Sequence, residues 1–258
     1  MKFKYFSFLL ICFFTFQLSA QQEEDLTEEE IESSMNGVSN FFAGNETDRV
    51  IWDSGTMGFG ISSYLADGSG FSMPTMYNFL DQKHFRSGNF FIDVIELGLG
   101  LMPKDRVQKI RFHVGTRYSL VDYHFERAFR LEEDKETFQA AIMDVDKEIK
   151  RSRLHVHSLQ IPLMLKFRSN PESSNKSINF AIGYVYNLRF ASNFKIKFED
   201  KEKLKVKDDF NLRPSLGMVE GRIGVGAFNF YVQYGLDYLF ADDRGPMVTP
   251  INIGITSN

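Results

Sequence analysis

Apolar and polar residues alternate with a period of two along most of the chain, from about Thr56 to the C-terminal end. Such alternation indicates β-strands, because successive side chains of a strand point to opposite faces of its sheet. The clearest segment is 228–240, whose even positions are all aliphatic or aromatic and whose odd positions are mostly polar or small. Segments 178–190 and 110–120 repeat this pattern, so three strands each have one apolar and one mostly polar face.

Five further segments alternate less regularly and bring the predicted number of strands to about eight: 56–65, 90–102, 154–167, 213–226 and 248–256. In the third of these, the apolar residues move from even positions such as Leu154 to odd positions from Leu159 onward. Because one inserted residue reverses the faces of a strand, this change predicts a β-bulge near His157 or Ser158.

Short and long connections alternate between these strands. Short turns are expected around Lys104, Pro171 and Phe228. The long connections are 66–88, 122–152 and 191–212, and only the last outer connection, around 242–245, is brief. Outer-membrane barrels have short periplasmic turns and longer outer loops, and about ten tilted residues cross their apolar band of about 25 Å. The predicted fold is therefore all-β: a closed antiparallel up-and-down transmembrane β-barrel of about eight strands with a short N-terminal appendage.

The connection 122–152 has two interpretations. Its apolar residues fall near helical spacing: Leu131, Phe138, Ile142, Val145 and Ile149. Its flanks could equally continue the neighbouring strands as a projecting hairpin, and the sequence leaves both open.

The first twenty residues have the layout of a signal peptide: Lys2 and Lys4, an apolar run over 5–16, and small residues ending at Ala20. Cleavage after Ala20 would remove Cys12, which is the only cysteine. The mature chain would then lack disulfides, cysteine-bound metal and a cysteine nucleophile. No later stretch has the roughly eighteen apolar residues of a membrane-spanning helix. A formal net charge of −4 argues against nucleic-acid binding.

Residues 21–53 form an acidic leader ahead of the barrel, which we expect to occupy 54–258. In the leader, Thr27 and Glu30 have the spacing of a capping box before an apolar series, which predicts a short amphipathic helix. That helix would lie in the periplasm or plug the lumen. The alternative is a mobile terminal segment.

Residues 159–167, with the sequence LQIPLMLKF, resemble the "L-x-I-P-L-x-L-K-F" strand of outer-membrane barrels of the Bacteroidetes type that are often called PorT-like. The resemblance continues through Gly183, the glycines at 221, 224 and 226, and the aromatic strand that ends at Tyr238. It implies an outer-membrane location and a closed barrel of about eight strands, but no common reaction. Some relatives are associated with a protein-secretion machine. The ending Ile255-Thr256-Ser257-Asn258 departs from the aromatic terminus of many barrels.

Charged residues recur on the face opposite the apolar set: Glu96, Arg111, Arg117, Lys166, Arg189, Glu220, Arg222 and Asp237. The interior of an eight-stranded barrel is just wide enough for side chains to fill it. Unpaired charges would be costly in such an interior, so we expect a lumen network of paired opposite charges. A lumen of this kind would conduct few ions.

The sequence contains no phosphate loop, dinucleotide fingerprint, zincin helix, nucleophile elbow or calcium loop. His155 and His157 share a strand face and could contribute to a metal site, or they could be polar residues at the barrel rim. His124 and Glu126, beside Tyr123 and with a serine, could form a lipid-modifying site. Nothing in the spacing singles out either group, so no catalytic residue, cofactor or metal is expected.

The expected function is that of a non-enzymatic outer-membrane barrel, monomeric and surrounded by outer-membrane lipid. Its outer loops or leader would contact a component of the cell envelope. The family resemblance implies that this component could be a secretion protein. One alternative is a barrel enzyme that modifies lipid. A second is a soluble exported carrier of the lipocalin sort, with its apolar face turned inward.

Overall fold

The computed structural model describes residues 50–53, 55–68, 70–103, 106–127, 129–131, 140–141, 149–171 and 177–257. The predicted signal peptide and the leader up to residue 49 lie outside the described residues. The last four leader residues are described, and they form a strand, β1 (Val50–Asp53). A short strand therefore lies in the segment that the sequence analysis assigns to the leader.

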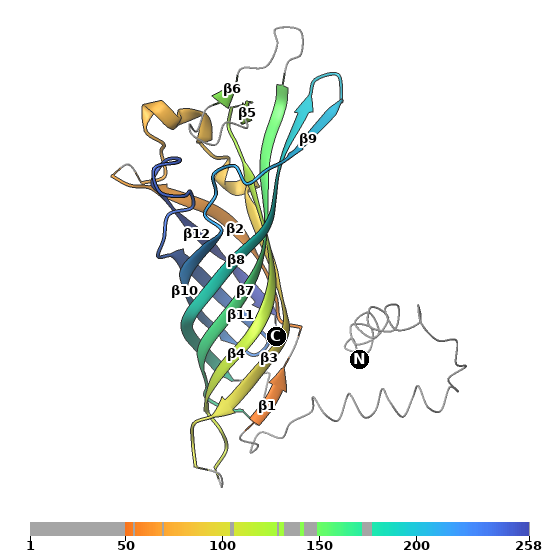
Figure 1. Cartoon of the computed structure of the whole chain (residues 1–258). Helices are drawn as coiled ribbons and strands as arrows, with labels where there is room; N and C mark the ends of the chain where they lie inside the picture. The colour runs from red at the N-terminus through yellow and green to blue at the C-terminus, as the bar shows by residue number, and fades with distance from the viewer. Residues whose placement is uncertain are drawn as a thin grey trace, which may run out of the picture. The chain divides into compact units, whose positions relative to one another are not determined.

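Eight antiparallel strands close into a barrel, as predicted (Figure 1). They are β2 (Met57–Ala66), β3 (Gly88–Gly100), β4 (Ile110–His124), β7 (Ile149–Arg168), β8 (Ile178–Phe198), β10 (Ser215–Val225), β11 (Phe228–Gly235) and β12 (Val248–Ser257). Each strand pairs with the next, and β12 pairs with β2 to complete the ring. Within this ring of eight described strands, closure leaves no unpaired edge, as the hydrocarbon core of a membrane requires.

Shorter elements are attached to this barrel. Strand β1 pairs with the lower end of β3, below the point where β2 begins. Strand β9 (Lys203–Lys207) pairs with β8, and β5 (Arg130–Leu131) pairs with β6 (Ala140–Ala141). Two 3₁₀ helices, η1 (Thr75–Leu80) and η2 (His84–Arg86), lie in the connection between β2 and β3. Within the described residues, no helix is both long and apolar enough to cross a membrane.

The two ends of the barrel differ in their connections. One end has the short turns, including a two-residue turn in which Gly226 adopts a positive φ of 64°. At the other end β4, β7 and β8 continue well beyond their neighbours (Figure 1). Pairing of β4 with β7 up to His124 and Arg153 supports the hairpin interpretation for the flanks of 122–152. Much of the predicted connection 191–212 is strand, because β8 runs on to Phe198 and turns back through β9.

The membrane barrel is the part of the wall with an apolar exterior. Strand β11 is its simplest example: Phe228 and Phe230 are 66% and 68% exposed, while Tyr231 and Gln233 are buried inside. The same orientation holds around the ring, where aliphatic and aromatic side chains face outward on every strand. This polarity is opposite to that of a lipocalin-like cup with an apolar interior.

The outer extension reverses this arrangement. We use the name for the upper ends of β4 (121–124), β7 (149–157) and β8 (191–198), together with β9 and the outer connections. Its interior is a hydrophobic core made of Tyr64, Ala66, Met73, Leu80, Tyr123, Phe125, Phe129, Leu154, Val156, Phe194, Ile196, Phe198, Phe210, Leu212, Leu239, Phe240 and Val248. Its outer surface carries charged and imidazole side chains. The extension is thus organised like a water-soluble β-protein.

Strands β7 and β8 achieve this reversal differently. In β7 the even positions from Ser152 to Lys166 point inward, and the sequence changes from polar Gln160 below to apolar Leu154 above. In β8 the apolar residues stay on even positions, but their face changes because Phe190 is an extra residue between Arg189 and Ala191. The predicted irregularity at His157 and Ser158 is present in the β7–β8 ladder. The expectation that β7 itself carries the bulge is wrong.

Candidate functional site

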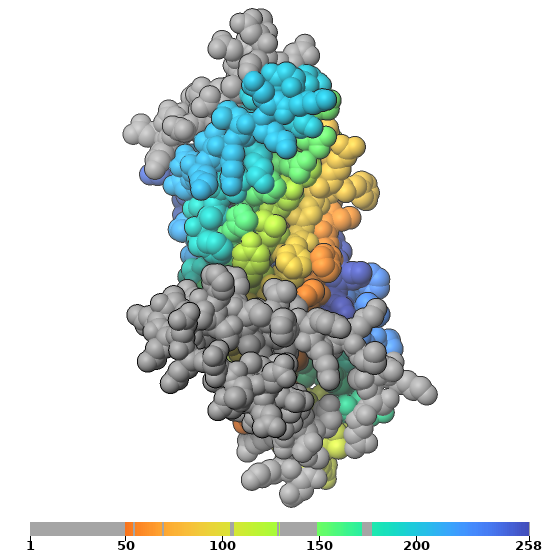
Figure 2. Space-filling model, turned by 90° about the vertical axis from the view of Figure 1, so that its right-hand side faces the viewer, coloured from red at the N-terminus to blue at the C-terminus, as the bar shows by residue number. Residues whose placement is uncertain are grey.

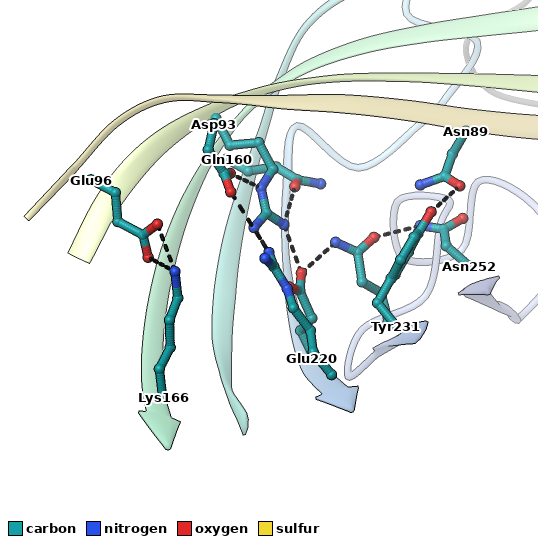
Figure 3. A network of polar contacts seen from close by, with 11 residues as sticks. Asn89, Asp93, Glu96, Gln160, Lys166, Glu220, Tyr231 and Asn252 are labelled. Atoms are coloured by element: carbon teal, nitrogen blue, oxygen red, sulfur yellow. Dashed lines mark hydrogen bonds and ion pairs between the residues drawn. The ribbon is translucent and has the colours of Figure 1, made fainter. Parts of the chain in front are cut away.

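Arg117 is the centre of an ion-pair network inside the membrane barrel. Figure 3 draws the network from close by, with its carboxylates Asp93 and Glu220 labelled. Its fully buried guanidinium donates from Nε to Asp93 and from Nη1 to Glu220 at 2.6 Å. Arg222 donates to the other oxygen of Glu220 and lies 3.8 Å from Asp93. Arg117 also stacks over the Phe91 ring, 4.1 Å from its centroid. Two cations and two anions therefore lie in contact across the lumen, an arrangement that avoids the cost of an unpaired buried charge.

Amide side chains extend this network toward β12. Gln233 donates to Glu220 at 2.7 Å and accepts a hydrogen bond from Asn252 at 2.9 Å. Ser62 in turn donates to Asn252 at 2.7 Å. This chain of hydrogen bonds crosses from β10 through β11 and β12 to β2, so polar contacts tie four strands together from the inside.

A second cluster lies nearer the short-turn end. Lys166 pairs with both carboxylate oxygens of Glu96, at 2.7 and 2.8 Å. The Nδ1 atom of His113 lies 3.1 Å from the same carboxylate. Arg111 on the neighbouring strand β4 is also buried and faces inward, directly across the ladder from Lys166. These residues fill the lumen below the Arg117 network.

Two of the predicted lumen residues join neither cluster: Arg189 faces inward above them and lines the boundary cavity, and Asp237 lies outside the lumen. Arg189 sits at the top of the membrane barrel, where it donates to the backbone oxygens of Leu212 and Arg213. Asp237 is exposed, because β11 ends at Gly235, and its carboxylate accepts the Gly217 N–H. The alternating sequence pattern continues past the end of the strand, which explains why the inward assignment fails for Asp237.

Asp93 is a central member of the network, and the alternation in the sequence does not predict it. Regular alternation along β3 cannot turn both Asp93 and Glu96 inward, but Val94 is an extra residue between Asp93 and Ile95. The bulge lets both carboxylates face the lumen. The signal in the sequence is the apolar pair Val94-Ile95 between two acids, since a regular strand would bury one of this pair in the polar lumen.

The outer extension has a different interior chemistry. Phe129 contacts Phe125 and Phe194 with ring centroids 4.9 and 5.3 Å apart, and Phe79 from η1 approaches it at 5.1 Å. Aromatic pairs of this geometry add stabilisation beyond the burial of their area. A cavity at the boundary between the two regions is lined by polar residues such as Gln160 and by apolar residues of the extension core.

The histidines on the outer face of β7 have partners. His155 Nδ1 lies 3.6 Å from Asp122, and His157 Nδ1 lies 2.7 Å from the Tyr118 hydroxyl. Burial, assisted by Lys195 and Arg153, lowers the pKa of His155 to about 4, although Asp122 opposes this shift. In the described part of the chain, no group of three or more potential ligands could hold a metal ion.

The residues considered for lipid chemistry do not assemble into one site. Tyr123 is buried in the extension core, whereas His124 lies on the opposite face of β4 and contacts Asp122 at 3.2 Å. A serine–histidine contact does occur elsewhere, between Ser63 and His84 Nδ1 at 2.9 Å. Among the described residues, no carboxylate hydrogen bonds to His84 to complete a triad.

A closed ring of eight antiparallel strands, with an apolar wall around a polar, filled lumen, defines a transmembrane barrel of the outer-membrane class. The chain belongs to the family described as "Outer membrane protein beta-barrel domain", whose model matches residues 42–241. No curated protein is significantly similar in sequence.

Solved structures with similar folds include Neisserial surface protein A, with 8% identity, coverage of 81% of this chain and 99% of that chain, and a TM-score of 0.35. Another is Ail, the attachment invasion locus protein of Yersinia pestis, with 12% identity, coverage of 80% and 97%, and a TM-score of 0.31.

Proposed function

We propose that this protein is a non-enzymatic barrel of the outer membrane whose outer extension binds another component of the cell envelope. The observation that carries the proposal is the extension itself, a packed core that stands beyond the apolar wall and supports the outer connections. The connection between β2 and β3 exposes large apolar side chains to solvent: Phe71 (55%), Met76 (73%) and Phe85 (93%). Contiguous exposed apolar patches mark protein contact sites, so we assign the partner contact to this connection.

The filled lumen supports binding over transport. Buried side chains from all sides meet at Arg117 and Glu220, both of which are almost inaccessible to solvent. In planar bilayers the purified barrel should give no large, steady conductance. A stable open channel would contradict the proposal.

Partner contact can be tested with the triple variant Phe71→Ser, Met76→Ser and Phe85→Ser. Crosslinking in intact cells should recover the partner with the wild-type barrel and lose it with this variant, at equal barrel levels in the membrane. The variant Lys83→Gln, in the same connection, is the matched control. The resemblance to PorT-like barrels makes a component of a secretion machine the first partner to seek, and unchanged capture by the triple variant would refute the assigned contact surface.

A further inference from the structure

The upper ends of β7 and β8, together with β9, form a three-stranded blade whose outer surface is strongly basic. The ladder sets Arg153 opposite Lys195, which in turn lies opposite Lys205. One step further along, Arg151, Lys197 and Lys203 form a second row. Residues paired across a ladder have side chains on the same face, about 5 Å apart at Cβ. We call this surface the basic face; its members are Arg151, Arg153, Lys195, Lys197, Lys203, Lys205 and Lys207.

Few carboxylates balance these charges. On this face Asp122 lies 3.7 Å from Arg153 and also contacts two histidines. The β8–β9 turn holds three more carboxylates, Glu199, which pairs with Lys150 at 2.8 Å, and Asp200 and Glu202. Within the described residues, none of the five lysines of the basic face takes part in an ion pair. Like charges directly opposite each other destabilise a sheet, so a row of cations across three strands favours an external anion.

The opposite side of the blade explains why the lysines are held in place. Leu204 and Val206 alternate with them along β9 and pack against the extension core. The blade therefore has one apolar face that is anchored inside and one basic face that is turned outward. In Figure 2 the cyan to light blue atoms of upper β8 and of β9 cover the upper part of the side that faces the viewer.

The height of the basic face above the lipid-facing wall limits the lipids that can reach it. The outward row of β7 runs without interruption from lipid-facing Leu159 to Arg153 and Arg151. At roughly 2.5 Å of axial rise per tilted residue, these cations stand about 15 to 20 Å beyond Leu159. Phospholipid headgroups extend only about 5 to 8 Å beyond the hydrocarbon core. A lipid that reaches the basic face from the side must therefore carry a larger anionic headgroup.

We propose that the basic face binds the anionic saccharide headgroup of an outer-leaflet glycolipid, through phosphate or carboxylate groups on its sugars. The glycolipid chains would pack against the apolar wall directly below, while the lysines and arginines contact the headgroup. This lateral lipid site is separate from the partner contact at Phe71, Met76 and Phe85, so either proposal can fail without the other.

The test measures labelled lipid that stays bound to the full mature barrel after washing in neutral detergent. The probes are rough lipopolysaccharide with phosphorylated core sugars, phosphatidylglycerol and phosphatidylcholine. We expect preferential retention of the lipopolysaccharide, with a loss of at least about tenfold between 0.1 and 1 M salt, because screening shortens the Debye length from about 10 to 3 Å.

The variant Lys195→Gln/Lys197→Gln/Lys205→Gln should lower lipopolysaccharide retention about tenfold. The matched control Lys83→Gln/Arg86→Gln/Arg244→Gln removes three exposed cations from other outer connections and should retain the lipid. The single change Lys205→Gln, on edge strand β9, should give a smaller loss in the same direction if the triple variant folds poorly. Equal loss in the control, equal retention of phosphatidylglycerol, or binding of soluble dextran sulfate without retention of lipopolysaccharide would each overturn the proposal.

Discussion

The membrane barrel and the outer extension use the same strands with opposite interiors. Below the boundary near Ser158, charged and amide groups are buried while aliphatic residues face outward; above it, phenylalanines are buried while lysines and histidines face outward. In each region, the outward side chains are of the kind that the surrounding medium solvates: apolar toward lipid and charged toward water. The comparison teaches that one set of continuous β-strands can build two regions, one with an outer surface suited to lipid and one with an outer surface suited to water.

The largest expected effect comes from the membrane barrel. Arg117→Met would leave Asp93 and Glu220 without their central cation, and removal of one partner from a buried ion pair costs about 3 to 5 kcal/mol. Urea unfolding of the barrel in lipid vesicles should report this loss, and the exposed Arg106→Met should change stability little. If Arg117→Met were neutral, the network would not hold the interior together.

A loss of stability of similar size, but confined to the outer extension, is expected from a change in the extension core. Phe194→Ala would open a cavity among the packed rings, at a cost of about 3 to 5 kcal/mol. Hydrogen exchange should then increase in β9 and the upper parts of β7 and β8, while the amides of β11 and β12 stay protected. Uniform loss of protection in all strands would mean that the two regions fold as one unit.

Outward positions give a more direct comparison of the two surroundings. Val232→Arg places a charge on the lipid-facing wall of β11 and should cost about 2 to 4 kcal/mol if it lies near the membrane midplane. Lys205→Val makes the opposite exchange on the outward side of the extension and should leave folding into vesicles nearly unchanged. Similar penalties for both exchanges would remove the distinction between lipid-facing and water-facing walls. Gln233→Arg is unsuitable as a control, because Gln233 is bonded to Glu220 and Asn252.

The smallest expected effect is a pH dependence confined to the extension. His155 lies above the membrane barrel, and its pKa of about 4 in the folded chain is below the ordinary value of 6.5. The unfolded chain therefore binds this proton more readily, so stability is complete above about pH 6.5 and declines as the pH falls toward 4. The groups facing His155 are Asp122, Arg153, Lys195 and His157. Limited proteolysis should show this decline, and His155→Gln should reduce it.

The sequence predicts the barrel well because a period of two is a local property of each strand. Strand number, closure and the outward set of β11 follow from it, and Glu96, Lys166, Arg117, Glu220 and Arg222 do face the lumen. The pairing of Arg117 with Asp93 cannot be predicted in this way, since it depends on the bulge at Val94 and on contacts between distant strands.

The outer extension is harder to predict from the same pattern. Alternation reveals that one face is apolar but not whether that face turns toward lipid or toward a core. Leu154 and Val156 illustrate this: their shift to even positions marks a change of surroundings, although it resembles a bulge in β7. The apolar cluster on η1 and the outer connections has no such periodicity, so only the fold brings Phe79 to Phe129.

The extra residue Phe190 has a consequence for how such a barrel can change over evolutionary time. In β7, the reversal of faces depends on the side chain at each position. Successive substitutions can therefore shift the boundary between the two regions up or down this strand. In β8, the reversal depends on one residue of chain length between Arg189 and Ala191. Loss of that single codon would turn Phe194 and Ile196 toward water and Lys195 toward the core at once. The length of β8 is therefore constrained more tightly than its composition, and viable lineages should vary the side chain at position 190 while keeping the residue count.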